Sequence, residues 1–535
     1  MTVEEALAVS AVRESESPRL DGDPGLGEET RRAMRVANVE GVLALASDNF
    51  AGPYVSLYAL SLGASNTQIG LVNALPALLT NVLQIPFAIL SDRLQRRKAF
   101  WVIGGGGMRV SWLPIALIPY FAVSPGAAVL AYIALLALRS VFAAASMPAW
   151  TSLMADMTPR SIRGAYFSNR NILINLSAFT ATLASGAVLR YLGEPVGYQA
   201  VFLIAAAFGL AAGCATTRFP DFDAPARLAA RAGQEAGAAP ARRRGPGWRR
   251  RAEGRPAAGF NLQEFLAGVR QEKSFVTYAL ASAVWNFGVM APQPLFPVHF
   301  VEVLGGTPGF WGVVSASTFF TTVLGQRYWG RLNDQFGGRS VLVAGGIIAG
   351  VIPGLWFLAY RPEHALWINL LSGLGWAGFN LAAFNLLLEV TPDRGRSTYV
   401  AAYNALIGLS QFTGPILGGV AADLFGARPV FLASTLIRLA AWWAFAYRLK
   451  TAHERPVTWR DFIPVSAGAL KRLPHEAAQL PGRVVRRLRA RLLERRLRQK
   501  MERRRVETAL QEALKQGEPG ASGDDPSEQD HRPGA

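Results

Sequence analysis

The stretch LSDRLQRRK, residues 90–98, places a dense group of charges directly against a long apolar run. Residues 69–90 carry no charged side chain at all. The helix of a soluble protein usually alternates polar and apolar faces, and this run does not. We therefore interpret residues 69–90 as a helix that crosses a lipid bilayer. It ends at water, where Asp92 and the basic residues that follow it begin.

The composition of the whole chain agrees with a membrane protein. Only 17% of its 535 residues are charged and its mean hydropathy is +0.20, whereas soluble domains carry about 25% charged residues. The charge is concentrated at the N-terminus, in one central stretch and in the C-terminal tail. Between these regions lie apolar blocks of about 20 residues, the length that crosses a bilayer core about 30 Å thick.

Twelve apolar blocks are long enough to span a membrane. They cover residues 42–62, 69–90, 99–121, 127–154, 172–192, 198–217, 275–300, 310–329, 340–360, 365–388, 398–422 and 429–447. Lys and Arg concentrate in the loops after blocks 2, 4, 8 and 10. Because basic loops stay on the cytoplasmic side, this bias predicts a multi-pass protein of the cell membrane with both termini in the cytoplasm.

The two halves of the chain repeat several features in the same order. Asp92 and Asp334 are 242 positions apart, as are Arg97 and Arg339. The dipeptide Thr-Pro at 158–159 returns at 391–392, and Asn-Phe at 49–50 returns at 286–287. Offsets that stay similar along the chain predict two six-helix halves in parallel orientation.

These features resemble the major facilitator superfamily, in which a G-x-x-x-D-R-x-G-R-R element follows spans 2 and 8. The first copy has Ala88 and Gln95 in place of the two glycines, and the second has Gln335 where a basic residue is usual. The resemblance implies an all-α membrane protein with 12 transmembrane helices in two pseudo-symmetric six-helix bundles. The predicted parts are an N-terminal tail (1–35), the two bundles (36–218 and 274–450), an Arg-rich linker (219–273) and a basic tail (451–535).

The resemblance also implies a gating role for the repeated element. A carboxylate near a helix N-terminus is favoured by the helix dipole, and arginines bridge carboxylates. If these contacts join the halves on the cytoplasmic side, they hold that side shut in the outward-open state. The expected gating residues are Asp92, Arg93, Arg97, Gly330, Asp334 and Arg339.

Three ionisable residues inside the predicted spans of the first half are candidates for coupling. An ionisable group at the bilayer centre costs about 2.5–3.5 kcal/mol on insertion scales, so its presence indicates function. Asp48 lies in span 1, Arg109 in span 3 and Arg139 in span 4. The segment around Arg139 resembles the span-4 element of proton-linked family members, which implies that Arg139 tunes proton transfer. We hypothesise that Asp48 is the proton-coupling carboxylate and that Arg139 or Arg109 biases its protonation. The alternatives are a static ion pair and a position in a loop or at the membrane interface.

A set of amides and indoles is expected around a central substrate cavity between the halves, near the bilayer midplane. Aromatic faces with scattered amides suit a neutral or cationic organic molecule, or a sugar; hydrogen bonding between helices is the alternative role for each residue. We expect Trp311, Trp356 and Trp367 to form an interfacial belt instead. The cavity set comprises Asn171, Asn175, Trp285, Asn286, Trp376, Asn380, Asn385, Asn404 and Gln411.

The polar segments outside the spans are strongly basic. The net charge of +18 comes largely from the linker and the tail. An apolar stripe on the basic tail favours binding to anionic lipid over binding to nucleic acid, for which the tail lacks stacking aromatics. We expect no metal or cofactor, and a monomer.

These observations favour a secondary transporter that moves a small organic solute by alternating access. Proton coupling is expected, with export as an antiporter slightly preferred over uptake. The chain has no Walker-type P-loop, so ATP is not the direct drive, and no cluster of histidines or carboxylates indicates an enzyme. A non-transporting sensor or assembly factor built on the same fold is the alternative.

Overall fold

A computed structural model describes residues 28–94, 96–159, 162–220, 272–392 and 396–449. Within these ranges the regular structure is entirely helical. Most of the predicted N-terminal tail, nearly all of the linker and the whole basic tail lie outside the described residues, as do the lipid contacts expected there.

The first half contains six helical passes. The first pass is α2, η1 and α3 in succession, and the third is α5 followed by α6. The bounds are α2 (Glu28–Ala51), η1 (Gly52–Tyr54), α3 (Val55–Ser61), α4 (Asn66–Leu94), α5 (Arg97–Val110), α6 (Trp112–Phe121), α7 (Pro125–Met157), α8 (Arg163–Leu192) and α9 (Val196–Thr217).

The second half repeats this plan with six passes, and its last helix ends in a short π-helical segment, η2. The bounds are α13 (Lys273–Met290), α14 (Leu295–Glu302), α15 (Pro308–Phe336), α16 (Gly338–Phe357), α17 (Pro362–Val390), α18 (Arg396–Phe425), α19 (Ala427–Trp443) and η2 (Ala444–Arg448).

Both halves interrupt their first pass at a comparable place. Pro53 lies in η1 between α2 and α3, and Pro292 and Pro294 lie between α13 and α14. Proline cannot donate the backbone hydrogen bond that a continuing helix requires, which accounts for the breaks. The shared break supports the internal repeat that the sequence predicts.

Ten of the described helical segments are long and apolar enough to cross a membrane on length and composition alone. The other two of the twelve passes are the first, in α2 and α3, and the eighth, in α15. Helix α2 begins among charged residues and carries Glu40 and Asp48, while the end of α15 carries Arg331. These side chains lower the hydropathy of the two passes, so the remaining evidence that they span the membrane is their place in the repeat.

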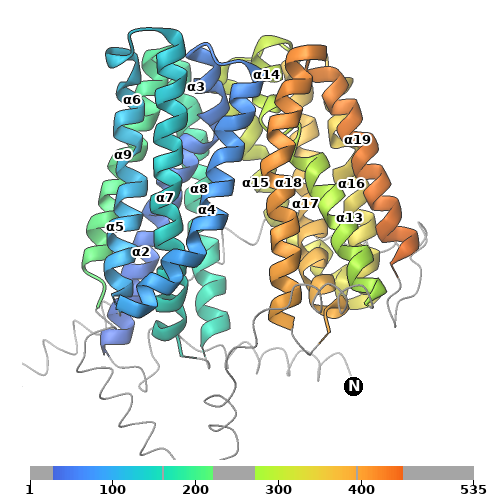
Figure 1. The fold of residues 1–535 in the computed structure, drawn as a ribbon, viewed down its shortest axis with the longest axis horizontal. Coiled ribbons are helices and arrows are strands. Elements are labelled where there is room, and N and C mark those ends of the chain that lie inside the picture. The colour runs from blue at the N-terminus through green and yellow to red at the C-terminus, as the bar shows by residue number, and fades with distance from the viewer. Residues whose placement is uncertain (1–27, 95, 160–161, 221–271, 393–395, 450–535) are drawn as a thin grey trace, which may run out of the picture. The chain divides into compact units, whose positions relative to one another are not determined.

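The two halves meet at one end, which we call the α3/α14 end because both short helices lie there (Figure 1). Figure 1 shows α4 and α18 side by side near this end and apart toward the other. That other end, where α2 begins and α13 begins, we call the linker end. Along α4, residues Ile69, Gly70 and Val72 are buried, whereas Val82 and Ile89 are exposed. The contact with α18 therefore covers the first part of α4.

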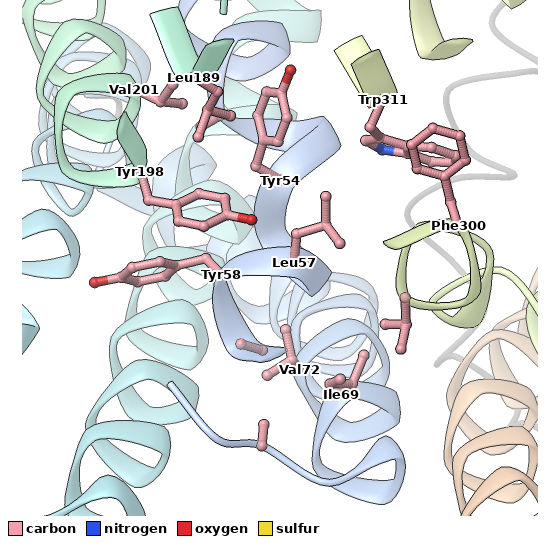
Figure 2. Close-up of a cluster of buried hydrophobic side chains, with 14 of the residues drawn as sticks. Tyr54, Leu57, Tyr58, Ile69, Val72, Leu189, Tyr198, Val201, Phe300 and Trp311 are labelled. Atoms are coloured by element: carbon pink, nitrogen blue, oxygen red, sulfur yellow. The ribbon is translucent and has the colours of Figure 1, made fainter. Parts of the chain in front are cut away.

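A single apolar core crosses from one half to the other at the α3/α14 end. Tyr54, Leu57 and Ile69 of the first half belong to the same cluster as Phe300 and Trp311 of the second (Figure 2). The indole Nε1 of Trp311 donates a hydrogen bond to the carbonyl oxygen of Pro53, 3.0 Å away. At the linker end, by contrast, the cluster around Trp101 and Tyr166 contains residues of the first half alone.

The expected interfacial belt is wrong for two of its three tryptophans. Trp311 is 8% exposed and Trp356 is 2% exposed, because both pack into the core shared by the halves. Trp367 is 69% exposed, as a residue of the belt would be.

Backbone atoms of the two halves touch along two seams at the α3/α14 end. On the α4–α18 seam, a Cβ added to Gly70 would lie 2.2 Å from the carbonyl oxygen of Pro415. On the α8–α15 seam, a Cβ added to Gly186 would lie 2.8 Å from the carbonyl oxygen of Gly309. Real Cβ atoms do not approach backbone oxygens so closely, so the closed arrangement of this end requires glycine at both positions.

We predict that Gly70→Ala opens the α3/α14 end. The added methyl group meets a backbone carbonyl, which cannot move away as a flexible side chain would. Spin labels at Val123 and Arg361, in a background with Cys214 replaced by serine, report the separation of the halves by double electron–electron resonance. The distance distribution should shift to longer values in Gly70→Ala.

Gly213→Ala is the matched control, since a Cβ there meets open space within a helix. An unchanged distribution in Gly70→Ala, or an equal shift in Gly213→Ala, would show that the seam does not depend on this glycine.

Candidate functional site

An ion pair joins the first and fourth passes. The Nη2 atom of Arg139 on α7 lies 2.5 Å from Oδ1 of Asp48 on α2. The second terminal nitrogen, Nη1, donates to the carbonyl oxygen of Met108. The guanidinium carbon lies 4.2 Å from the ring centroid of Trp112. The side chain of Arg139 is 13% exposed, but that of Asp48 is 32% exposed. The carboxylate is thus both paired and open to its surroundings.

A second, sealed charge cluster lies two turns away on α2. Oε1 of Glu40 accepts a hydrogen bond from Arg109 of α5 at 2.9 Å, and Oε2 lies 3.9 Å from Arg170 of α8. Glu40, Arg109 and Arg170 are 2%, 7% and 5% exposed. One carboxylate therefore faces two guanidiniums, and the Nε atoms of both arginines have no hydrogen-bond partner among the described residues.

Small residues make room for this cluster. A Cβ added to Gly209 of α9 would lie 2.5 Å from the Cβ of Arg109, and one added to Gly41 of α2 would lie 2.4 Å from Arg170. The two glycines therefore let the long side chains fold into the bundle interior. The cluster joins α2, α5 and α8 in the interior of the first half.

Glu40 is a site residue that the sequence analysis missed. Because span 1 was predicted to begin at residue 42, Glu40 fell outside it and Asp48 was the only acid expected inside the first half. The structure buries Glu40 as a second one. A signal was present: the buried residues Ala33, Ala37, Glu40, Ala44 and Ser47 follow a helical repeat on one side of α2. An acid on a buried stripe of small residues must find a partner inside the protein.

The second half treats its buried charge differently. Arg438 of α19 is 2% exposed and donates to the carbonyl oxygens of Gly288 and Ala349, at 3.2 and 3.0 Å. Neutral backbone acceptors thus hold this guanidinium in place of a carboxylate. The ion pairs described inside the bundles lie in the first half.

The structure places the expected cavity residues on several helices with different exposure. Trp285 is buried, where it stacks on Phe379 at 4.4 Å between ring centroids. Gln411 of α18 accepts a hydrogen bond of 3.3 Å from Asn81 of α4, so this amide pair joins the halves. The sequence analysis did not select Asn81. Five of the expected residues are exposed, namely Asn171, Asn175, Asn380, Asn385 and Asn404, and Asn286, Trp376 and Gln411 are half-buried.

The expected gating residues lie at the linker end. Arg97 donates to Ser152 at 2.6 Å and to Asp156 at 2.9 Å, which ties α5 to α7. Arg339 donates to the carbonyl oxygens of Phe445 and Ala446, at 3.4 and 2.5 Å, which ties α16 to the end of the last helix. These bonds run within each half.

The other members of the gating set form no contact between the halves that the structure describes. Arg93 is exposed, and a Cβ added to Gly330 would meet open space. The side chains of Asp92 and Asp334 are not among those that the structure describes. The predicted gating contact between the halves at the linker end stays a prediction.

Comparison with known proteins places this architecture in a family. The sequence matches the Major Facilitator Superfamily over residues 41–305 and 274–497. The chain belongs to the Major Facilitator Superfamily. The predicted fold class, two pseudo-symmetric six-helix bundles of membrane helices, is thereby confirmed, and the protein is a transporter rather than an enzyme.

Similar proteins of known name are transporters of several kinds. The multi-drug resistance efflux pump PmrA of Streptococcus pneumoniae is 23% identical over 412 residues, which cover 75% of this chain and 92% of PmrA. The multidrug resistance protein MdtG of Escherichia coli is 27% identical over 177 residues, 32% of this chain and 42% of MdtG. The D-arabinitol transporter of Klebsiella pneumoniae is 28% identical over 159 residues, 29% of this chain and 37% of that protein.

Solved structures share the fold at low sequence identity. The nucleoside transporter NupG aligns with a TM-score of 0.55 and 13% identity, over 80% of this chain and all of NupG. A bacterial homologue of the human lysosomal transporter Spinster, solved in an inward-facing and unoccupied conformation, aligns with a TM-score of 0.55 and 16% identity. It covers 79% of this chain and 97% of its own. At these identities the likeness establishes the fold alone.

We predict that Glu40 stabilises the first half. Breaking a buried ion pair by removing one partner costs about 3–5 kcal/mol, because the remaining charge is left without compensation. Glu40→Gln should therefore lower the thermal unfolding midpoint of the detergent-solubilised protein by several degrees. Glu28→Gln, which removes an exposed carboxylate from the first turn of the same helix, should leave the midpoint unchanged.

A double variant tests whether the effect is the ion pair itself. Glu40→Gln with Arg109→Gln should lose less stability than the sum of the two single variants. Additive losses would mean that Glu40 and Arg109 act independently.

Proposed function

We propose that the protein is a proton-driven exporter that moves a lipophilic, neutral or cationic organic molecule by alternating access. In this proposal the linker end faces the cytoplasm and the α3/α14 end faces the outside. The described arrangement is then a state that is shut toward the outside. The observation that carries the proposal is the Asp48–Arg139 pair, because it combines a fixed partner with a half-buried carboxylate inside a helix of the bundle.

The chemistry assigned to this pair follows from its two protonation states. Ionised Asp48 compensates the charge of Arg139, and both groups are then satisfied. Protonation of Asp48 leaves Arg139 without a counter-charge in a poorly hydrated place, which is costly. A rearrangement of the halves that brings water to the site lowers this cost. Proton binding and conformation thereby become linked, since each state of the carboxylate favours a different arrangement.

The sealed cluster of Glu40, Arg109 and Arg170 has a different role in the proposal. Its three groups join α2, α5 and α8 deep in the first half, so they hold these helices together while the halves move. Because the first half is then rigid, a movement that follows protonation of Asp48 changes the contact between the halves. In a flexible half, the same movement would be confined to one helix.

Two observations favour a lipophilic substrate and export. PmrA and MdtG are named as multidrug efflux or resistance proteins, and PmrA aligns over most of its length. The exposed side chains of the expected cavity set are amides, and the indole of Trp376 is half-buried. The set contains no carboxylate that would select for a positively charged substrate. Because the D-arabinitol transporter is also similar, a polar solute is the second candidate substrate.

The test measures coupling and exchange separately in liposomes. A lipophilic cation such as tetraphenylphosphonium serves as the probe. We expect Asp48→Asn to abolish accumulation driven by an imposed pH gradient, while exchange of labelled for unlabelled probe continues. Neutral asparagine cannot carry a proton, but it leaves the path for the substrate open.

Asp48→Glu is the matched variant, and it should retain part of the gradient-driven transport. If Asp48→Asn still accumulates the probe against its gradient, Asp48 is not the coupling group. If Asp48→Asn loses exchange and thermal stability together, the pair is a static structural contact.

A further inference from the structure

A carboxylate from one half completes the start of a helix in the other half. Oδ1 of Asp423, near the end of α18, accepts a hydrogen bond from the backbone N–H of Asn66 at 2.9 Å. Oδ2 accepts from the backbone N–H of Thr67 at 2.8 Å and from its hydroxyl at 2.6 Å. Asn66 and Thr67 are the first two residues of α4. Both oxygens of this carboxylate are therefore bound across the boundary between the halves.

The sequence around the start of α4 explains why these two N–H groups are available. The Ser65 hydroxyl accepts from the backbone N–H of Gln68, and the Gln68 side chain accepts from the backbone N–H of Ser65. This reciprocal pair is a capping box, which satisfies its own two donors. The N–H of Ile69 binds the carbonyl oxygen of Ser65 as the first bond of the helix. The donors of Asn66 and Thr67 are left over, and Asp423 takes both.

Two other hydrogen bonds between the halves join neutral groups. They are the amide pair of Asn81 and Gln411 and the bond from Trp311 to Pro53. Hydrogen bonds to an ionised acceptor are about twice as strong as neutral ones, and the positive end of the α4 dipole adds to the attraction. Of these three contacts, the exposed one made by Asp423 has the charged acceptor and the most hydrogen bonds.

The position of Asp423 ties it to the backbone seam. Gly419 lies one turn before Asp423 on α18, and a Cβ added there would lie 2.3 Å from the carbonyl oxygen of Asn66. The same two residues at the start of α4 therefore meet α18 through a glycine and through the carboxylate. The halves cannot separate at this end without breaking all three bonds of Asp423.

We propose that Asp423 is a latch that caps α4 from the opposite half and holds the α3/α14 end shut. When that end opens, the backbone donors of Asn66 and Thr67 and the carboxylate, which is already exposed, form hydrogen bonds to water instead. Because the bonds exist in one arrangement only, the latch shifts the balance between the two states by their net strength. This inference rests on alternating access, but it is independent of the coupling ion, the substrate and the direction of transport.

The first test measures the population of the open α3/α14 end. Spin labels at Val123 and Arg361 in the Cys214→Ser background report the separation of the halves by double electron–electron resonance. We expect Asp423→Asn to raise the ratio of long to short distances on the order of tenfold, since a neutral amide accepts at one atom only. Thr67→Val removes the hydroxyl and keeps both backbone donors, so it should give a smaller rise.

Glu363→Gln is the matched control, because it removes an exposed carboxylate from the first turn of α17 at the same end. It should leave the distances unchanged. Unchanged distances in Asp423→Asn, or an equal rise in Glu363→Gln, would overturn the latch.

A crosslink tests the same contact without weakening the fold. Cysteines in place of Thr67 and Asp423, in the Cys214→Ser background, should form a disulfide under oxidation that stops transport of the tetraphenylphosphonium probe. Dithiothreitol should restore transport. Continued transport by the crosslinked protein would show that the contact does not open during the cycle. This outcome is distinct from failure of the proton-coupling proposal, which the Asp48 variants decide.

Discussion

The two halves touch backbone to backbone at the α3/α14 end, and the rest of the structure depends on that contact. Gly70 meets the carbonyl of Pro415 on one side and Gly186 meets that of Gly309 on the other. Such a contact is either formed or broken, because backbone atoms cannot adjust their positions gradually as flexible side chains can. Helices that touch at one end and diverge along their length leave the polar residues of their other parts accessible. In our proposal, the rigid contact at one end determines which face of the protein is open.

Charge and packing are divided unequally between the two halves. The first half carries the buried Glu40 cluster and the Asp48–Arg139 pair, whereas the second half buries Arg438 against carbonyl oxygens. The family relationship makes the protein a transporter, and in our proposal the first half is the one that responds to protonation. The interior of the second half contains stacked aromatic rings, Trp285 on Phe379.

The parts of the fold that could be predicted are those that a bilayer imposes locally. Long apolar blocks and basic loops give the spans, and the spacing of Asp92 and Asp334 gives the repeat. Asp48 and Arg139 could be selected because ionisable groups are costly in lipid. Glu40 was missed because the charged start of α2 hides where the bundle interior begins. Asp423 was missed because an acid near the end of a span has an ordinary explanation in contact with water.

Contacts between segments distant in sequence could not be predicted. Trp311 and Trp356 lie near the ends of their spans, where an interfacial belt is expected, yet the halves meet there and bury them. No window of the sequence shows that the start of α4 faces the end of α18. The capping box of Ser65 and Gln68 is visible in the sequence, but the partner of the two remaining donors is not.

Alternating movement of the halves is the central claim, and distances at both ends of the same protein test it most directly. One pair of spin labels at Val123 and Arg361 reports the α3/α14 end, and a second pair at Leu94 and Glu389 reports the linker end. Across a series of pH values and substrate concentrations, the account predicts that one distance lengthens whenever the other shortens. Distances that change in the same direction, or a linker end that stays open under all conditions, would contradict it.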